Sequence, residues 1–161
     1  MAIKMIRLFS ALTLFSLFLI VTACGPDYNT DFEPPPPNAS VEEVFPEEID
    51  GMNVKIKRMT LTQPLEGFSA EYGRDKISID AILAPSKNIA DDHFKNVIVP
   101  LFDEMKNHYR GQVNGKWSAS GTDEHGRKWF AWVNNSWAFI ISGSDKGNLM
   151  KAIDAFKYVA L

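Results

Sequence analysis

The sequence predicts an α+β domain, an antiparallel sheet with two helices, which follows a cleaved signal and a proline-rich tether. Two observations predict this class. Short segments in which apolar and polar residues alternate, as is typical of strands, occur in two groups of three. Each group is followed by a segment whose apolar residues recur at spacings of three and four, as is typical of an amphipathic helix. The expected order is therefore βββ-α-βββ-α, and helices segregated from the strands of an antiparallel sheet belong to the α+β class.

Composition is compatible with one domain and argues against one class of partner. The chain has 161 residues, of which 45% are hydrophobic, enough for a single domain with a real core. It has 17 basic and 20 acidic residues, and two of the basic ones, Lys4 and Arg7, lie in the export signal described next. Nucleic-acid binding depends on concentrated positive charge, so we expect no nucleic-acid partner.

The start of the chain has the pattern of an export signal. Two positive charges come first, and residues 8–21 are then almost uninterruptedly apolar. This apolar run of about 14 residues suits a signal core and is shorter than the about 20 residues that a transmembrane helix needs.

The tetrapeptide Val21-Thr22-Ala23-Cys24 resembles the lipobox of bacterial lipoproteins, in which an aliphatic residue and two small or permissive residues precede a cysteine. In that family the thiol takes a diacylglycerol, the signal is cut just before the cysteine, and the new amino group is often acylated too. The resemblance implies a signal peptide over 1–23 and a lipid, such as palmitate, on Cys24. The alternative is an unmodified thiol after an ordinary signal peptide.

The resemblance also implies a location. Two or three acyl chains hold a protein lastingly on a bilayer, because each buried methylene contributes about 0.8 kcal/mol. Gly25 stands where lipoproteins that stay on the inner membrane of enteric bacteria often carry Asp. We therefore expect a cell-envelope protein, on the outer membrane and facing the periplasm where the cell has two membranes.

Residues 24–44 are interpreted as the lipidated cysteine and a tether, and residues 45–161 as one α+β domain. Pro34 to Pro37 lack backbone donors and favour a stiff polyproline II spacer. A docking motif for a proline-recognising partner is the alternative.

The first half of the domain is predicted to be a meander followed by a helix. Its strands are expected over residues 54–61, 67–72 and 76–84, with a turn at residues 73–75. The helix is expected from a cap at Ser86 or Asn88 to Gly111, with Pro100 kinking it or dividing it in two. Its apolar face is formed by residues at helical spacing, namely Phe94, Val97, Ile98, Leu101, Met105 and Tyr109.

The second half repeats this order. Strands are expected over residues 116–121, 127–133 and 136–142, and Asn134-Asn135 is expected to form the tight loop between the last two. The final helix is expected to begin at a cap on Ser144 or Asp145. Its predicted buried stripe is Leu149, Ile153, Phe156 and Ala160.

This element order is similar to that of the extrinsic oxygen-evolving-complex subunits of photosystems and their small bacterial relatives. The similarity rests on order alone, with no shared motif, and a ferredoxin-like arrangement competes with it. Function is not inherited from either, because it belongs to sites rather than to folds.

Aromatic residues are the most informative feature of the predicted domain. If helices cover only one sheet face, some of these rings form a solvent-facing surface that stacks on sugars or peptides or contacts a protein. If both faces are covered, the rings are core. The candidate binding surface consists of Trp117, Trp129, Phe130, Trp132 and Trp137.

Catalytic chemistry has little support in the sequence. His93, His108 and His125 follow no metal-ligand spacing, and no nucleophile elbow, phosphate-binding glycine loop or zinc motif occurs. Asp123, Glu124 and His125 are the one dense acidic-imidazole group, which is either a metal or acid–base site or simply a good turn.

We therefore expect a lipid-anchored, non-catalytic accessory or binding domain without cofactor or metal, whose partner is an envelope protein or a cell-wall component. The alternative is a small hydrolase or metal-dependent enzyme that uses Asp123, Glu124 and His125.

Overall fold

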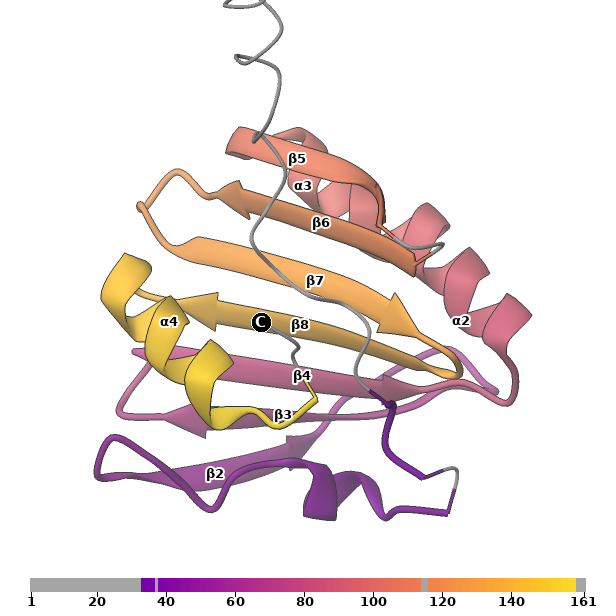
Figure 1. Ribbon diagram of the computed structural model, residues 1–161, viewed down its shortest axis with the longest axis horizontal. Helices are drawn as coiled ribbons and strands as arrows, with labels where there is room; N and C mark the ends of the chain where they lie inside the picture. Colours follow the sequence, from indigo (N-terminus) through magenta and orange to yellow (C-terminus); the bar gives the residue numbers. More distant parts are fainter. Residues whose placement is uncertain (1–32, 37, 114–115, 159–161) are drawn as a thin grey trace, which may run out of the picture.

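The structure, a computed structural model, describes residues 33–36, 38–113 and 116–158. Within them lies one antiparallel sheet of eight strands, with helices on both of its faces (Figure 1). In chain order the strands are β1 (Glu48–Ile49), β2 (Met52–Arg58), β3 (Glu66–Tyr72), β4 (Ile77–Leu83), β5 (Lys106–Val113), β6 (Lys116–Thr122), β7 (Lys128–Asn134) and β8 (Trp137–Gly143). Their order across the sheet is β1-β2-β3-β4-β8-β7-β6-β5.

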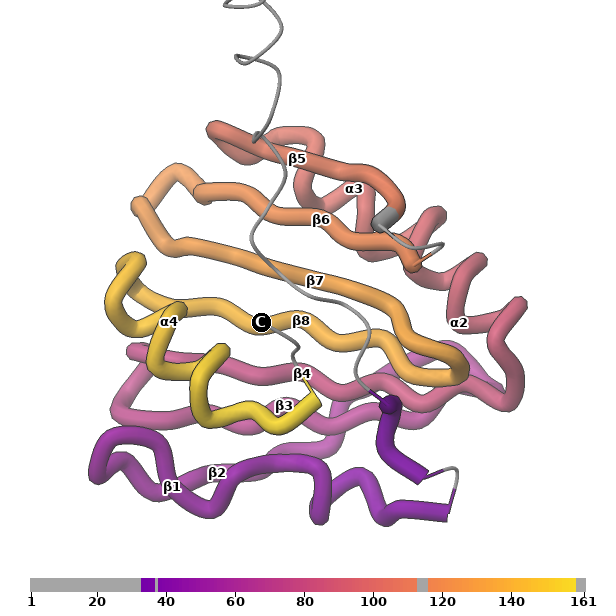
Figure 2. Tube along the Cα trace, viewed as in Figure 1, coloured from indigo at the N-terminus to yellow at the C-terminus, as the bar shows by residue number. Residues whose placement is uncertain are grey.

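The α+β class and the antiparallel sheet are thus confirmed, and the predicted order of elements is only roughly correct. The three predicted strands of the first half are present as the β2–β3–β4 meander. Two strands were not predicted: the short β1, which pairs with the start of β2, and β5, which forms the opposite edge (Figure 2). Each half therefore contributes four strands rather than three.

The hairpin of β7 and β8 is confirmed, with its loop displaced by one residue. Asn134 pairs with Trp137, so the loop residues are Asn135 and Ser136 rather than Asn134 and Asn135. Asn135 has a φ of 55°, a left-handed value that asparagine tolerates better than most residues. The hairpin places β8 beside β4 at the centre of the sheet, where seven residue pairs join the two halves of the chain.

The predicted helix over residues 86–111 is helical only as far as Asp103, and its last part is wrong. Helix α2 (Lys87–His93) continues into a π-helical segment η2 (Phe94–Ile98) and then into α3 (Val99–Asp103), and the chain enters β5 at Lys106. The amide of Val99 donates to the carbonyl of Phe94, five residues earlier, just ahead of Pro100, which has no amide hydrogen to donate.

The wide π turn also rotates the buried face. Val97 and Leu101, which were predicted to be buried, are 50% and 59% exposed, whereas Val99 and Phe102 are buried. Met105 and Tyr109 lie beyond the helix, so their helical spacing to Leu101 has no structural meaning.

Of the two arrangements that the sequence left open, helices on one face or coverage of both faces, the structure has the second. In Figure 1, helix α4 (Lys146–Ala155) lies in front of the sheet, and α2 and α3 lie behind it. Two separate clusters of buried residues correspond to these faces, one with Leu149 and Ile153 from α4 and the other with Phe94 and Phe102 from the α2–α3 segment. Both faces of the central strands are therefore core.

Helix α4 begins as predicted. The carboxylate of Asp145 accepts the amide hydrogen of Asn148 at 2.9 Å, which satisfies a donor at the helix start. Leu149, Ile153 and Phe156 form its buried stripe. The helix ends at Ala155, and Ala160 lies outside the described residues.

Packed structure starts ahead of residue 45, the predicted boundary between tether and domain. A short 3-10 helix, η1 (Val41–Val44), places Val41 and Val44 in the cluster on the α4 face, at 5% and 1% exposure. Ser40 caps this turn, and Pro35 is already buried. The predicted signal, Cys24 and the first part of the tether lie outside the described residues. No helix within the described ranges is long and apolar enough to cross a bilayer.

Candidate functional site

Three of the five aromatic residues that were predicted as a binding surface are enclosed. Phe130 and Trp132 on β7 are each 2% exposed, and Trp137 on β8 is fully buried. The Trp132 ring stacks on Phe139, with centroids 5.1 Å apart, beneath α4. These three rings are core on the α4 face and are not accessible to a ligand, because that face is covered.

The other two rings, Trp117 on β6 and Trp129 on β7, are half-buried on the opposite face. A cation lies over each of them: Lys95 Nζ is 5.3 Å from the Trp117 ring, and the Arg127 guanidinium is 5.7 Å from the Trp129 ring. The Trp129 indole also donates to a carboxylate oxygen of Asp123 at 3.0 Å. Each ring therefore already contacts a positively charged side chain, and neither is a free surface for stacking on a ligand.

The acidic-imidazole group is a hydrogen-bonded turn between β6 and β7. One oxygen of Asp123 accepts from the amides of His125 and Arg127, each at 2.9 Å, and the other accepts from Trp129. Partial burial acts to raise the pKa of Asp123, but these hydrogen bonds outweigh it and hold the pKa below the usual range. Glu124 and His125 point into solvent, at 84% and 82% side-chain exposure.

This arrangement leaves the turn poorly suited to the alternative enzymatic role. Asp123 is hydrogen-bonded to the backbone and the indole, whereas Glu124 and His125 lie 3.4 Å from each other on a highly exposed surface, without the enclosure that positions catalytic groups. Across the described part of the chain, no group of three His, Cys, Asp or Glu side chains is arranged to hold a metal ion.

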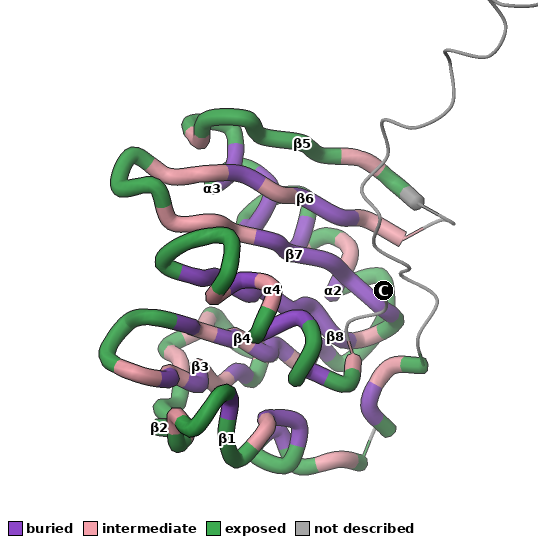
Figure 3. Tube along the Cα trace, turned by 60° about the vertical axis from the view of Figure 1, so that its left-hand side comes forward, coloured by how far each residue is buried: buried purple, intermediate pink, exposed green. Residues whose placement is uncertain are grey.

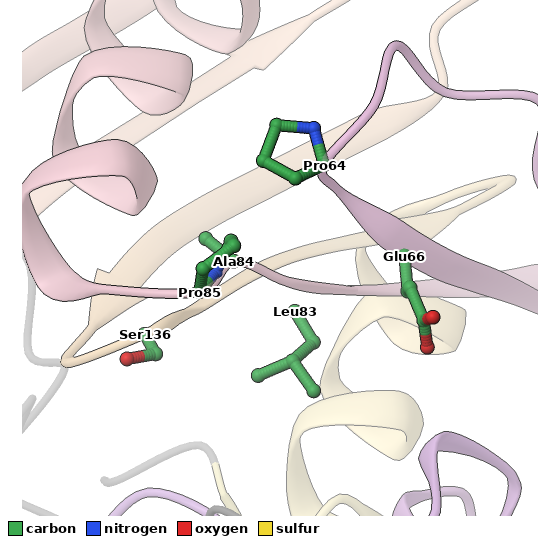
Figure 4. Close-up of a pocket in the computed structure, with 6 residues that line it drawn as sticks. All are labelled: Pro64, Glu66, Leu83, Ala84, Pro85 and Ser136. Carbon is green, nitrogen blue, oxygen red and sulfur yellow. The ribbon is translucent and has the colours of Figure 1, made fainter.

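An open pocket of about 400 Å³ lies where strands β3 and β4 meet the β7–β8 loop (Figure 4). Its walls are polar and apolar in similar measure, and its one charged lining residue is Glu66. The residues that line it are Pro64, Glu66, Leu83, Ala84, Pro85 and Ser136. Figure 4 shows Leu83, Glu66 and Ser136 on one side of β4 and the ring of Pro64 on the other. The labelled side chains do not converge on one point, so the pocket is an open recess of mixed polarity rather than a convergent polar site.

A polar region occupies the face that carries α2 and α3, on the half of the sheet away from those helices. The α2–α3 segment contacts chiefly β5 to β8, so this face of β3 and β4 stays partly open. Four half-exposed polar residues lie there in two cross-strand pairs, Ser69 with Asp80 and Glu71 with Ser78. We call these four residues the Asp80 patch.

The patch is bordered by charge on one side and by the core on the other. On β2 the exposed Lys57 and Lys55 stand opposite Ser69 and Glu71. On β8 the neighbour of Asp80 is Ile140, a member of the buried cluster beneath the helices. The patch therefore lies at the boundary between a solvated sheet edge and an apolar interior.

Asp80 has an unusual environment for a carboxylate. Burial raises its pKa, and hydrogen bonds from the hydroxyls of Ser69 and Ser78 offset only part of that effect. The Nζ atom of Lys57 lies 2.8 Å from a carboxylate oxygen of Glu71, so this lysine forms an ion pair with Glu71. Among the described residues no cationic side chain forms an ion pair with Asp80.

Sequence reasoning missed this patch because it followed the apolar stripe of each strand. The apolar stripe on β4, Ile77, Ile79 and Ala81, predicts the strand and its buried face but not the role of the alternate positions. The available signal was that polar residues occupy every second position in two consecutive segments, Ser69 and Glu71 and then Ser78 and Asp80.

No protein family matches this chain, and no curated protein or solved structure matches it significantly. The similarity to oxygen-evolving-complex subunits that element order suggested therefore remains a prediction.

Proposed function

We propose that the chain is an envelope lipoprotein, anchored to a membrane through Cys24, whose folded domain is a non-catalytic accessory or binding module. The observation that carries this proposal is the Val21-Thr22-Ala23-Cys24 sequence placed directly after a charged start and an apolar run. The outer membrane, facing the periplasm, is the proposed location in a cell with two membranes. An envelope protein or a cell-wall component is the proposed partner.

The organisation of the domain supports a module that works by contact. The turn at Asp123 is occupied by its own hydrogen bonds, and the conspicuous aromatic residues are packed or engaged. The described surface offers a partner a polar sheet face and an open recess of mixed polarity. Both suit recognition better than a reaction that requires an activated nucleophile.

The anchor is tested by metabolic labelling with radioactive palmitate in a bacterial host that expresses the full chain. The wild type should incorporate label, partition into the detergent phase and show a mass that corresponds to acylated Cys24 as the first residue. Cys24→Ser should abolish all three, because the hydroxyl does not replace the thiol in lipid transfer. Membrane fractions separated on a density gradient then report the location.

Thr22→Ser is the matched control, since it changes the same tetrapeptide while keeping a small residue at that position. It should be labelled as the wild type is. An unmodified Cys24 thiol in the wild-type protein, or a mature chain that starts elsewhere, would overturn the proposed anchoring.

A further inference from the structure

We propose that the Asp80 patch binds a primary ammonium group of a ligand, with the Asp80 carboxylate as its counter-ion and the Ser69 and Ser78 hydroxyls as further acceptors. The proposal concerns the folded domain and is independent of whether Cys24 is acylated.

The first argument is the uncompensated charge. Removing a carboxylate from water costs free energy unless a cation or several hydrogen bonds replace the lost hydration. Asp80 is half-buried at the centre of the sheet, has two neutral hydroxyl neighbours, and has no ion-pair partner within the described part of the chain. The two hydroxyls offset only part of the effect of burial, and a bound cation would remove the remaining cost.

The second argument is the match between donors and acceptors. A primary ammonium group has three N–H donors and no acceptor. Ser69 stands directly across from Asp80 on β3, and Ser78 precedes it by two residues on the same face of β4. Residues at such positions are separated by about 5 Å and about 7 Å respectively, so one small group can reach all three side chains. Each hydroxyl can donate to Asp80 and still accept from the ligand.

The third argument is the charge of the surroundings, which favours a cation over an anion or a neutral alcohol. Lys57 is neutralised by Glu71, and Lys55 lies at the sheet edge, two strands away from Asp80. Within the described residues, Asp80 is the carboxylate of the patch that has no ion-pair partner. A neutral hydroxyl ligand would supply hydrogen bonds without compensating that charge.

The test uses the mature, anchored protein in micelles of a nonionic detergent, which adds no competing ammonium headgroup. Ethylammonium chloride is titrated at neutral pH and constant ionic strength while backbone amide shifts are followed by NMR. With three heavy atoms this probe should bind with a dissociation constant of about 1 mM at best. The expected result is a saturable shift at the amides of residues 69, 78 and 80.

Two further probes define the chemistry. Ethanol has a similar size and no charge, and tetramethylammonium has the charge and no N–H donor. Both should produce shifts at least about tenfold weaker than those of ethylammonium, because each lacks one of the two features that the patch recognises. Equal responses to ethylammonium and tetramethylammonium would overturn the proposed acceptor set.

Asp80→Asn removes the charge while preserving the shape and should abolish the saturable shift. Asp92→Asn, at an exposed carboxylate on α2, is the matched control and should bind as the wild type does. Binding retained in Asp80→Asn overturns the proposal.

A second measurement covers the case in which the Asp80→Asn variant does not fold. The side-chain carboxyl signal of Asp80 in the wild type reports its pKa directly, and saturating ethylammonium should lower that pKa. An Asp80 pKa that is the same with and without the probe would refute the proposal.

Discussion

At the scale of single residues, Asp123 stabilises a turn, although its place beside Glu124 and His125 in the sequence resembles that of a catalytic acid. Its two carboxylate oxygens take three hydrogen bonds, two from the turn backbone and one from the indole of Trp129. The sequence showed an acid and an imidazole close together, but it could not show that the acid was already committed. Because these hydrogen bonds favour the ionised carboxylate, the contribution of Asp123 to the free energy of unfolding depends on pH.

We expect Asp123→Asn to lower the free energy of unfolding by about 1 kcal/mol at pH 7, because the amide cannot accept all three hydrogen bonds. The folded state lowers the pKa of Asp123, through hydrogen bonds that outweigh the opposing effect of burial. Its contribution should therefore be complete above the unfolded pKa of about 3.9 and disappear as the pH falls through the lower folded value.

Urea unfolding of both proteins at pH 7 and near pH 3 measures this difference. Glu124→Gln, which alters an almost fully solvated neighbour, should stay within about 0.5 kcal/mol of the wild type. A gap between wild type and Asp123→Asn that widened in acid would contradict the assignment.

At the scale of elements, the strongly patterned segments were predictable and those that depend on tertiary pairing were not. The β7–β8 hairpin and the α4 cap follow from local sequence, as Asn135 and Asp145 show. Strand β5 has no alternating apolar stripe and forms because β6 pairs along it. Met105 and Tyr109 happened to continue a helical spacing, so a pattern of a few residues favoured the wrong element.

The polar face of β3 and β4 was missed for a related reason. A strand that is core on one side and binding surface on the other has the same apolar stripe as an ordinary amphipathic strand. What distinguishes Asp80 from a solvated residue is its burial and its lack of a cation, and both arise from neighbours distant in sequence.

Helix α4 lies so close to the sheet that one glycine is required beneath it. A methyl group on Gly143 would lie 2.7 Å from the carbonyl carbon of Asn148 and collide with the backbone of Leu149. Backbone atoms cannot rotate away as a side chain would, so Gly143→Ala should destabilise the protein by about 3 kcal/mol or more.

Urea unfolding measures the cost, with Gly147→Ala as the control. Gly147 is in the first turn of α4, where the nearest atom to an added methyl is a side-chain oxygen of Asp145 at 3.2 Å. That variant should remain within about 1 kcal/mol of the wild type, since alanine also improves helix propensity. A harmless Gly143→Ala would show that α4 is held more loosely than its contacts indicate.

At the scale of the whole molecule, both open edges of the sheet are protected by charge. Strand β1 pairs with only Met52 and Asn53, which leaves the rest of β2 as an edge with exposed Lys55, Lys57 and Arg58. The opposite edge, β5, is largely exposed in Figure 3 and carries Lys106 and Arg110. Positive charges on edge strands oppose pairing with another copy, so the sheet resists edge-to-edge association.

The eight-stranded sheet also separates two cores that share the same strands. Ile141 on β8 faces α4, and the next residue back, Ile140, faces the α2–α3 segment. Strands β4, β7 and β8 contribute residues to both clusters. Unfolding of either cluster should therefore disrupt the strands against which the other cluster packs. The molecule should therefore unfold as one cooperative unit, even though its helices are on opposite sides.

A matched pair of core truncations tests this coupling. Ile98→Val on the α2–α3 side and Ile141→Val on the α4 side each remove one buried methyl group and should each cost about 1 kcal/mol. If unfolding is global, each variant should reduce hydrogen-exchange protection equally in the slowest amides of α4 and of the central strands, about fivefold for that cost. Loss of protection confined to the α2–α3 segment in Ile98→Val, with α4 unchanged, would mean that the two faces open independently and that the sheet does not couple them.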